Sequence, residues 1–170
     1  MDRPQTQSGP EAGAEGSLRL NVDTEVDGWP SVIDEDFAAG VASCLAAFID
    51  VQGEASLMLS DDDHVRALNE RFRQKDRPTN VLSFPPGPGS PENYLGDVIL
   101  ALQTVRREAD EEHKRFDHHV AHLIVHGLLH LAGYDHENDE EAEEMEALER
   151  DVLARLGIAD PYAEIEVRAQ

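Results

Sequence analysis

Short apolar stretches along the chain predict four β-strands. In residues 18–22, leucine and valine alternate with polar side chains, which is the period of a strand with one buried face. The other three stretches are short and have turn-forming residues close by: 55–59, 81–84 and 97–101.

Apolar residues spaced three or four positions apart predict five helices, over residues 34–49, 61–75, 102–113, 117–131 and 138–156. Residues 60–63 have the form of a capping box, which would start the second helix. Val65, Leu68 and Phe72 are expected to face inward from it. This helix should end shortly before Pro78, because a proline disfavours the helical conformation in the residue before it.

Strands mixed with helices indicate an α+β fold, and 170 residues suit a single domain with a sizeable core. Residues 1–16 are rich in Gly, Pro, Gln, Ala and Glu without periodicity, so we predict a disordered tail. The folded domain is expected over residues 17–162, followed by a C-terminal tail over 163–170.

The cysteine content and the hydropathy pattern bear on the compartment. The chain has one cysteine, Cys44, which cannot form an internal disulfide and suits a reducing cytosol. No basic start followed by an apolar run resembles a signal peptide, and no run approaches the ~18 apolar residues of a membrane span. We therefore expect a cytoplasmic protein that does not contact a membrane.

The formal net charge of −22 opposes nonspecific binding to nucleic acid, because the phosphate backbone attracts Lys and Arg. The acidic residues are concentrated in one late segment, 137–149, which we predict to be a solvated helix face. Basic residues gather in another place, at Arg71, Arg73, Lys75 and Arg77. A local positive cleft on an acidic body is therefore possible.

Three histidines late in the chain have the spacing of metal ligands. His126 and His130 are four residues apart, which on a helix is roughly 40° of rotation and about 6 Å of rise, so both leave one face. Gly133 tolerates the left-handed conformation that ends a helix, so the chain can turn back and present His136 as a third ligand. Three histidines leave a fourth tetrahedral position open for water, as in a catalytic zinc site.

The same spacing resembles the ligand pattern of the metzincin proteases, in which a glutamate after the first histidine is the general base. Here that position holds Gly127, which cannot accept a proton. Peptide hydrolysis is therefore disfavoured. A zinc-bound water, whose pKa the metal can lower to about 7, is left as the expected nucleophile.

Two long motifs resemble the YbeY family of bacterial rRNA-maturation endoribonucleases. Residues 126–136 read HGLLHLAGYDH, and residues 68–85 read LNERFRQKDRPTNVLSFP. The step 95–97 and the acidic helix 140–149 also match, so the resemblance covers most of residues 17–162. It implies a small mixed sheet with packed helices, one zinc per chain, and single-strand RNA cleavage in ribosomal RNA maturation and ribosome quality control. Its implied partners are ribosomal RNA and ribosomal proteins, with no DNA expected.

Four further residues are candidates for roles around the three histidines. Arg73 could hold a phosphate through its guanidinium fork, as the resemblance also implies, or it could be a surface arginine at a helix end. Asp135 could orient His136 or cap a turn. Ser83 could face substrate or be structural. His122 could line the cleft or add a fourth ligand, although a surface histidine bonded to a partner is the simpler alternative.

Two rival functions stay open at this point. One is a metal-dependent hydrolase of another ester or of peptides, which would use the same histidines. The other is a noncatalytic adaptor that zinc stabilises and that docks on ribosomal proteins through its acidic surface. Removal of the metal separates these, because an adaptor would unfold without losing any turnover.

Overall fold

The protein, as a computed structural model, is described over residues 17–73 and 79–162. The predicted tails, residues 1–16 and 163–170, lie outside the described residues, as does the end of the basic cluster. Across the described ranges, no helix combines the length and the apolar character needed to cross a membrane.

Four strands form one mixed sheet, as predicted, in the order β2 (Leu18–Thr24), β3 (Gly53–Ser60), β5 (Tyr94–Ala101) and β4 (Val81–Phe84). Strands β2, β3 and β5 run parallel to one another, and β4 pairs antiparallel with β5. The edge strand β4 therefore leaves one of its sides unpaired within this sheet.

Strand β5 begins earlier than the predicted residue 97, because Gly96 does not interrupt it. Gly96 has φ +133°, and a Cβ there would lie 2.2 Å from the carbonyl oxygen of Phe84. The glycine thus permits a close approach of β4 and β5 at this position.

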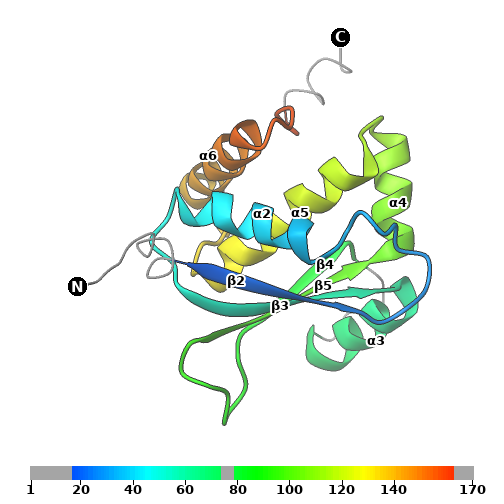
Figure 1. The fold of residues 1–170 in the computed structure, drawn as a ribbon, viewed down its shortest axis with the longest axis horizontal. Helices are drawn as coiled ribbons and strands as arrows, with labels where there is room; N and C mark the ends of the chain where they lie inside the picture. Colours follow the sequence, from blue (N-terminus) through cyan, green and yellow to red (C-terminus); the bar gives the residue numbers. More distant parts are fainter. Residues whose placement is uncertain (1–16, 74–78, 163–170) are drawn as a thin grey trace.

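The described residues form five helices, which lie on both faces of the sheet: α2 (Glu35–Ala46), α3 (Asp62–Arg73), α4 (Leu102–Glu111), α5 (Phe116–Leu131) and α6 (Asp139–Arg155). Helices α2 and α5 lie against one face, with α6 packed on these two helices, whereas α3 lies against the other face (Figure 1). The α+β fold with a small mixed sheet is therefore confirmed.

The strands supply two cores because successive side chains point to opposite faces. Leu57 and Val98 belong to the larger core, beneath α2, α5 and α6. Ile99 of β5 belongs to the smaller core, where it is joined by Val65 of α3. Helix α5 is covered on several sides, which fixes its position over the sheet.

Two details of α3 differ from the prediction. The cap is Asp61, whose Oδ1 accepts a hydrogen bond from the backbone N–H of His64 at 2.9 Å, while the Ser60 hydroxyl bonds the His64 ring. Phe72 does not face inward: it is 59% exposed and touches Phe84 edge-on, with ring centroids 5.5 Å apart. Phe84 is the last residue of the edge strand, and within residues 17–73 and 79–162 the sheet has no further strand beside it that could cover the Phe72 ring.

Candidate metal centre

The end of α5 brings the three histidines together. Gly133 has φ +104°, and its N–H donates to the carbonyl of His130 at 3.0 Å. The N–H of Tyr134 donates to the carbonyl of Leu129 at 2.9 Å, which completes the pattern of a Schellman turn. The chain then reverses and brings His136 back to the last turn of the helix. This turn was predicted from the position of Gly133.

The three imidazoles form a compact group. His126, His130 and His136 each offer one nitrogen, and these nitrogens all lie within 4.8 Å of one another. The ring centroid of His130 lies 4.7 Å from that of His126 and 5.0 Å from that of His136. His126 and His130 are partly buried, and His136 is exposed, so the group lies at the surface of the helix rather than inside the core.

Hydrogen bonds on the far side of two rings orient them for a metal. The Nδ1 of His126 lies 2.7 Å from Oε2 of Glu149, and the Nδ1 of His130 lies 3.1 Å from the carbonyl oxygen of Tyr134. An ionised carboxylate and a carbonyl can only accept, so each Nδ1 carries a proton, and in the neutral form of each ring the lone pair is on Nε2. Burial, with the charges of His126 and His136, lowers the pKa of His130 and favours its neutral form. The residues therefore fit a metal that prefers imidazole.

Glu149 on α6 is the residue that sequence reasoning missed. It is fully buried, and its carboxylate also accepts from Nε2 of His122 at 2.8 Å and from the hydroxyl of Tyr162. Burial alone would raise the pKa of Glu149, but the bonds from His122, His126 and Tyr162 and the charge of His122 outweigh it, and this pKa falls to about 2.

The prediction that residues 137–149 form a solvated acidic face is therefore wrong for Glu149, although the preceding acids are exposed or partly exposed. The available signal was its spacing. Glu149 follows Met145 by four residues and precedes Val152 by three, and both are buried. An acid at such a position lies on the apolar face of its helix.

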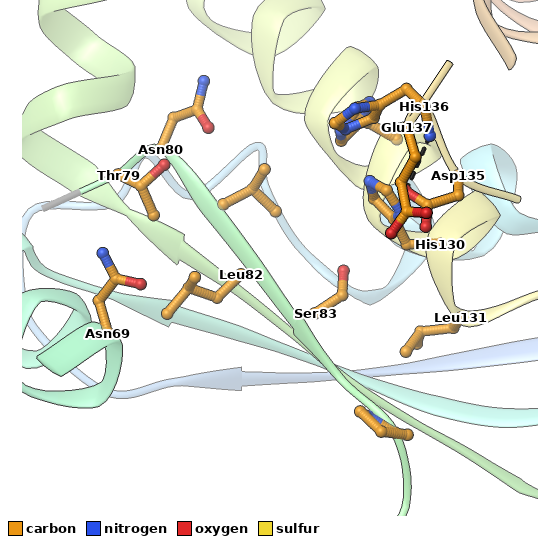
Figure 2. Close-up of a pocket in the computed structure, with 13 residues that line it drawn as sticks. Asn69, Thr79, Asn80, Leu82, Ser83, His130, Leu131, Asp135, His136 and Glu137 are labelled. Carbon is orange, nitrogen blue, oxygen red and sulfur yellow. Dashed lines mark hydrogen bonds between the residues drawn. The ribbon is translucent and has the colours of Figure 1, made fainter. Parts of the chain in front are cut away.

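A cleft of about 770 Å³ opens beside the histidine group. Figure 2 shows its walls: one is formed by His130 and the segment 135–137, and the opposite side carries Asn69, Thr79 and Asn80. The edge strand β4 runs between them. The three histidines are among the residues that line this cleft.

The other predicted site residues take different positions around this cleft. Ser83 lines it, and its hydroxyl donates to the carbonyl of Gly127 at 3.1 Å. Asp135 also lines it, but its Oδ1 accepts from the backbone N–H of His136 at 2.7 Å, which is a contact with the turn rather than with the ring.

His122 does not join the group of three, and the predicted role of Arg73 stays a prediction. The structure places His122 against Glu149, partly buried, and outside the lining of the cleft. Arg73 is the last residue of α3, and its side chain lies outside the described residues.

Gly127 has a packing role that its place in the motif did not indicate. A Cβ at this position would lie 2.7 Å from Cγ1 of Val98 and 3.1 Å from Oγ of Ser83. The position therefore faces the sheet, and a side chain there would push α5 away from β4 and β5. This close crossing leaves no room at position 127 for a glutamate like the general base of the metzincin proteases.

Comparisons with known proteins agree with this fold and identify the family. The family model described as Endoribonuclease YbeY matches residues 30–157. A protein of Rhodopseudomonas palustris named Endoribonuclease YbeY is 51% identical over 158 residues, which cover 90% of this chain and 74% of that protein. One of the same name from Nitrobacter hamburgensis is 48% identical over 160 residues, covering 90% of this chain and 75% of the relative.

A solved structure is similar as well. The solution structure of a Thermotoga maritima protein superposes with a TM-score of 0.53 at 28% identity, covering 82% of this chain and 91% of that one. The family match extends over most of the described domain and includes the histidine group and the cleft. The chain therefore belongs to the YbeY family of endoribonucleases.

Proposed function

We propose that this chain is a zinc-dependent endoribonuclease that cuts single-stranded ribosomal RNA in ribosomal RNA maturation and ribosome quality control. The observation that carries the proposal is the group formed by His126, His130 and His136 at the wall of an open cleft. Family membership supports the endoribonuclease activity, and the relatives carry that name. Ribosomal RNA, ribosomal proteins and a cytoplasmic location are further parts of the proposal.

Different residues of the chain would bind the metal and the RNA. The three histidines would hold the ion at the cleft, with the rings of His126 and His130 already oriented by their Nδ1 hydrogen bonds. Zinc, when bound, supplies a Lewis acid that lowers the pKa of water and withdraws charge from a phosphoryl oxygen. The cleft would admit an RNA strand with an extended backbone, and this RNA would lie against the residues of β4 that line the cleft.

We propose Arg73 as the residue that stabilises the phosphate. On α3 it follows Asn69 by four residues, so the helix places both positions on one side, and Asn69 lines the cleft. A guanidinium matches two phosphate oxygens at once and keeps its charge at any physiological pH. In a chain of net charge −22, such a group would carry a large share of RNA binding.

The acidic body of the chain sets the expected strength of that binding. Asp135 and Glu137 are among the described residues that line the cleft, and both repel phosphate when ionised. Affinity for free RNA should therefore be weak. Contacts with ribosomal proteins would offset this by holding the enzyme beside its substrate.

The activity is tested with labelled single-stranded RNA beside an unstructured protein substrate. We expect RNA cleavage by the zinc-loaded protein, and none by the metal-free protein or by His130→Ala. Metal-dependent proteolysis without RNA cleavage would favour the rival hydrolase, and zinc binding without turnover would favour the adaptor. Cleavage that persists in His130→Ala would reveal a contaminating ribonuclease.

The ribosomal role is tested in cells that lack the protein. Mapping of ribosomal RNA ends should show unprocessed termini, which the wild-type chain corrects and His126→Ala does not. Normal termini in the deletion strain would contradict the maturation role but would leave the nuclease activity standing.

A further inference from the structure

The buried carboxylate of Glu149 bonds the outer face of a predicted metal ligand, and nothing in the proposed reaction uses it. We infer that Glu149 is a positioning residue: it fixes the proton of His126 on Nδ1 and so determines how tightly the histidine group holds a metal. The inference rests on the proposed metal role of the three histidines. It adds a residue of α6 to a site whose ligands lie on α5 and the turn after it.

Three donors hold the carboxylate in one orientation. His122 and Tyr162 both donate to Oε1, and His126 bonds Oε2 at 2.7 Å. The two histidines are one turn apart on α5, while Tyr162 follows α6. With Oε1 occupied twice, Oε2 is the oxygen that faces His126, and it can only accept. The Nε2 lone pair of His126 is therefore directed to the other side of the ring, where His130 and His136 lie.

Stability alone gives no reason for a charged residue at this position. Glu149 lies among buried apolar side chains of α6 such as Met145 and Val152. Replacing a whole buried set of bonded charged groups by well-packed apolar residues is often neutral or stabilising. A carboxylate behind a metal-binding histidine, in contrast, fixes the ring's tautomer and orientation and makes the ring a stronger ligand.

The chain contains a second buried histidine–carboxylate pair that serves as a matched control. His119 is 4% exposed, and its Nε2 lies 2.9 Å from Oε1 of Glu108. The His119 ring is more buried than the His126 ring, with 5% against 25% of the side chain exposed, and Glu108 is less buried than Glu149, with 27% against 1% exposed. The contact between ring nitrogen and carboxylate is of similar length, but His119 is not part of the group of three. Loss of the carboxylate charge at Glu108 should therefore leave the metal site unchanged.

The test compares Glu149→Gln with Glu108→Gln. His122 and His126 bond different oxygens of the carboxylate, and a glutamine has an accepting oxygen at only one of these two positions and a donating NH₂ group at the other. In metal-free protein, nitrogen-15 NMR of the histidine rings should show the His126 proton moving from Nδ1 toward Nε2. Zinc affinity, measured by competition with a chelating dye, should fall about 10–100-fold, which is the usual effect of losing such a partner. Glu108→Gln should change neither quantity.

A milder variant keeps the inference testable if Glu149→Gln does not fold. Tyr162→Phe removes one donor to the carboxylate and leaves the His126 bond in place, so we expect a smaller loss of zinc affinity and an unchanged tautomer. Thermal unfolding of each metal-free variant shows whether it is folded.

Two results would overturn the inference. One is wild-type zinc affinity in both Glu149→Gln and Tyr162→Phe, and the other is an equal loss of affinity in Glu149→Gln and Glu108→Gln. If the wild-type chain binds no zinc, the proposed function fails instead. The tautomer measurement, made without metal, still decides whether Glu149 positions His126.

Discussion

Replacing Gly127 by alanine tests how closely α5 crosses the sheet. The added Cβ would lie 2.7 Å from Cγ1 and 3.1 Å from Cγ2 of Val98, whereas carbon atoms are most stable about 3.5–4.0 Å apart. Val98 is fully buried in β5, and a β-branched side chain has little rotamer freedom with which to move aside. Helix and strand must therefore separate.

The magnitude follows from two opposing effects. Alanine in place of glycine stabilises a helix interior by about 1 kcal/mol. Overpacking a close-packed contact costs typically 1–3 kcal/mol, and a contact under 3 Å against a rigid valine belongs in the upper part of that range. Gly127→Ala should thus lower the free energy of unfolding by about 1–2 kcal/mol.

Gly40 is the matched control, because it is also a glycine inside a helix but has nothing within 4 Å of its Cβ position. Gly40→Ala should raise the free energy of unfolding by up to about 1 kcal/mol. Urea denaturation of both metal-free variants measures the difference, and a zinc titration of Gly127→Ala should show weakened binding because α5 carries two of the ligands. Equal stabilisation by the two substitutions would refute the close crossing.

Three further outcomes are expected. Arg73→Ala should keep the fold and the bound zinc but lose RNA cleavage. Arg73→Lys should recover cleavage only in part, because lysine lacks the planar fork of the guanidinium. If zinc content or melting temperature fell as much as the cleavage rate, Arg73 would be a structural residue. Asn138→Ala should lower the free energy of unfolding by about 0.5–2 kcal/mol, since the Asn138 side chain accepts the N–H of Glu141 at the start of α6, and an unchanged melting curve would contradict the cap. Burial raises the pKa of the Cys44 thiol, so its alkylation at neutral pH should be slower in the folded than in the unfolded chain, and equal rates would contradict its placement.

The parts of the fold that local periodicity determines were predictable from the sequence. The alternation in residues 18–22 and the run 81–84 gave strands, and the three- to four-residue spacing gave all five helices of the described chain. The metal group was predictable for the same reason, because the helical spacing of His126 and His130 and the turn at Gly133 are local properties.

What local patterns could not reveal depends on partners far away in the chain. The fit of Gly127 against the sheet is set by Val98, which belongs to a different element. The exposure of Phe72 depends on where the edge strand ends. Glu149 is an intermediate case: its position between Met145 and Val152 marked it as buried, but only the folded chain shows that its partners are His122 and His126.

The central claim, that a metal held by the three histidines is required for RNA cleavage, is tested most directly by adding zinc to the metal-free protein. The rate of cleavage of a labelled single-stranded RNA is measured against the zinc bound per chain, for the wild type and for His136→Ala. We predict no cleavage without metal, a rise that ends at one zinc per chain, and little or no rise in the variant. Full cleavage by the metal-free protein, or an unchanged zinc dependence in His136→Ala, would contradict the account.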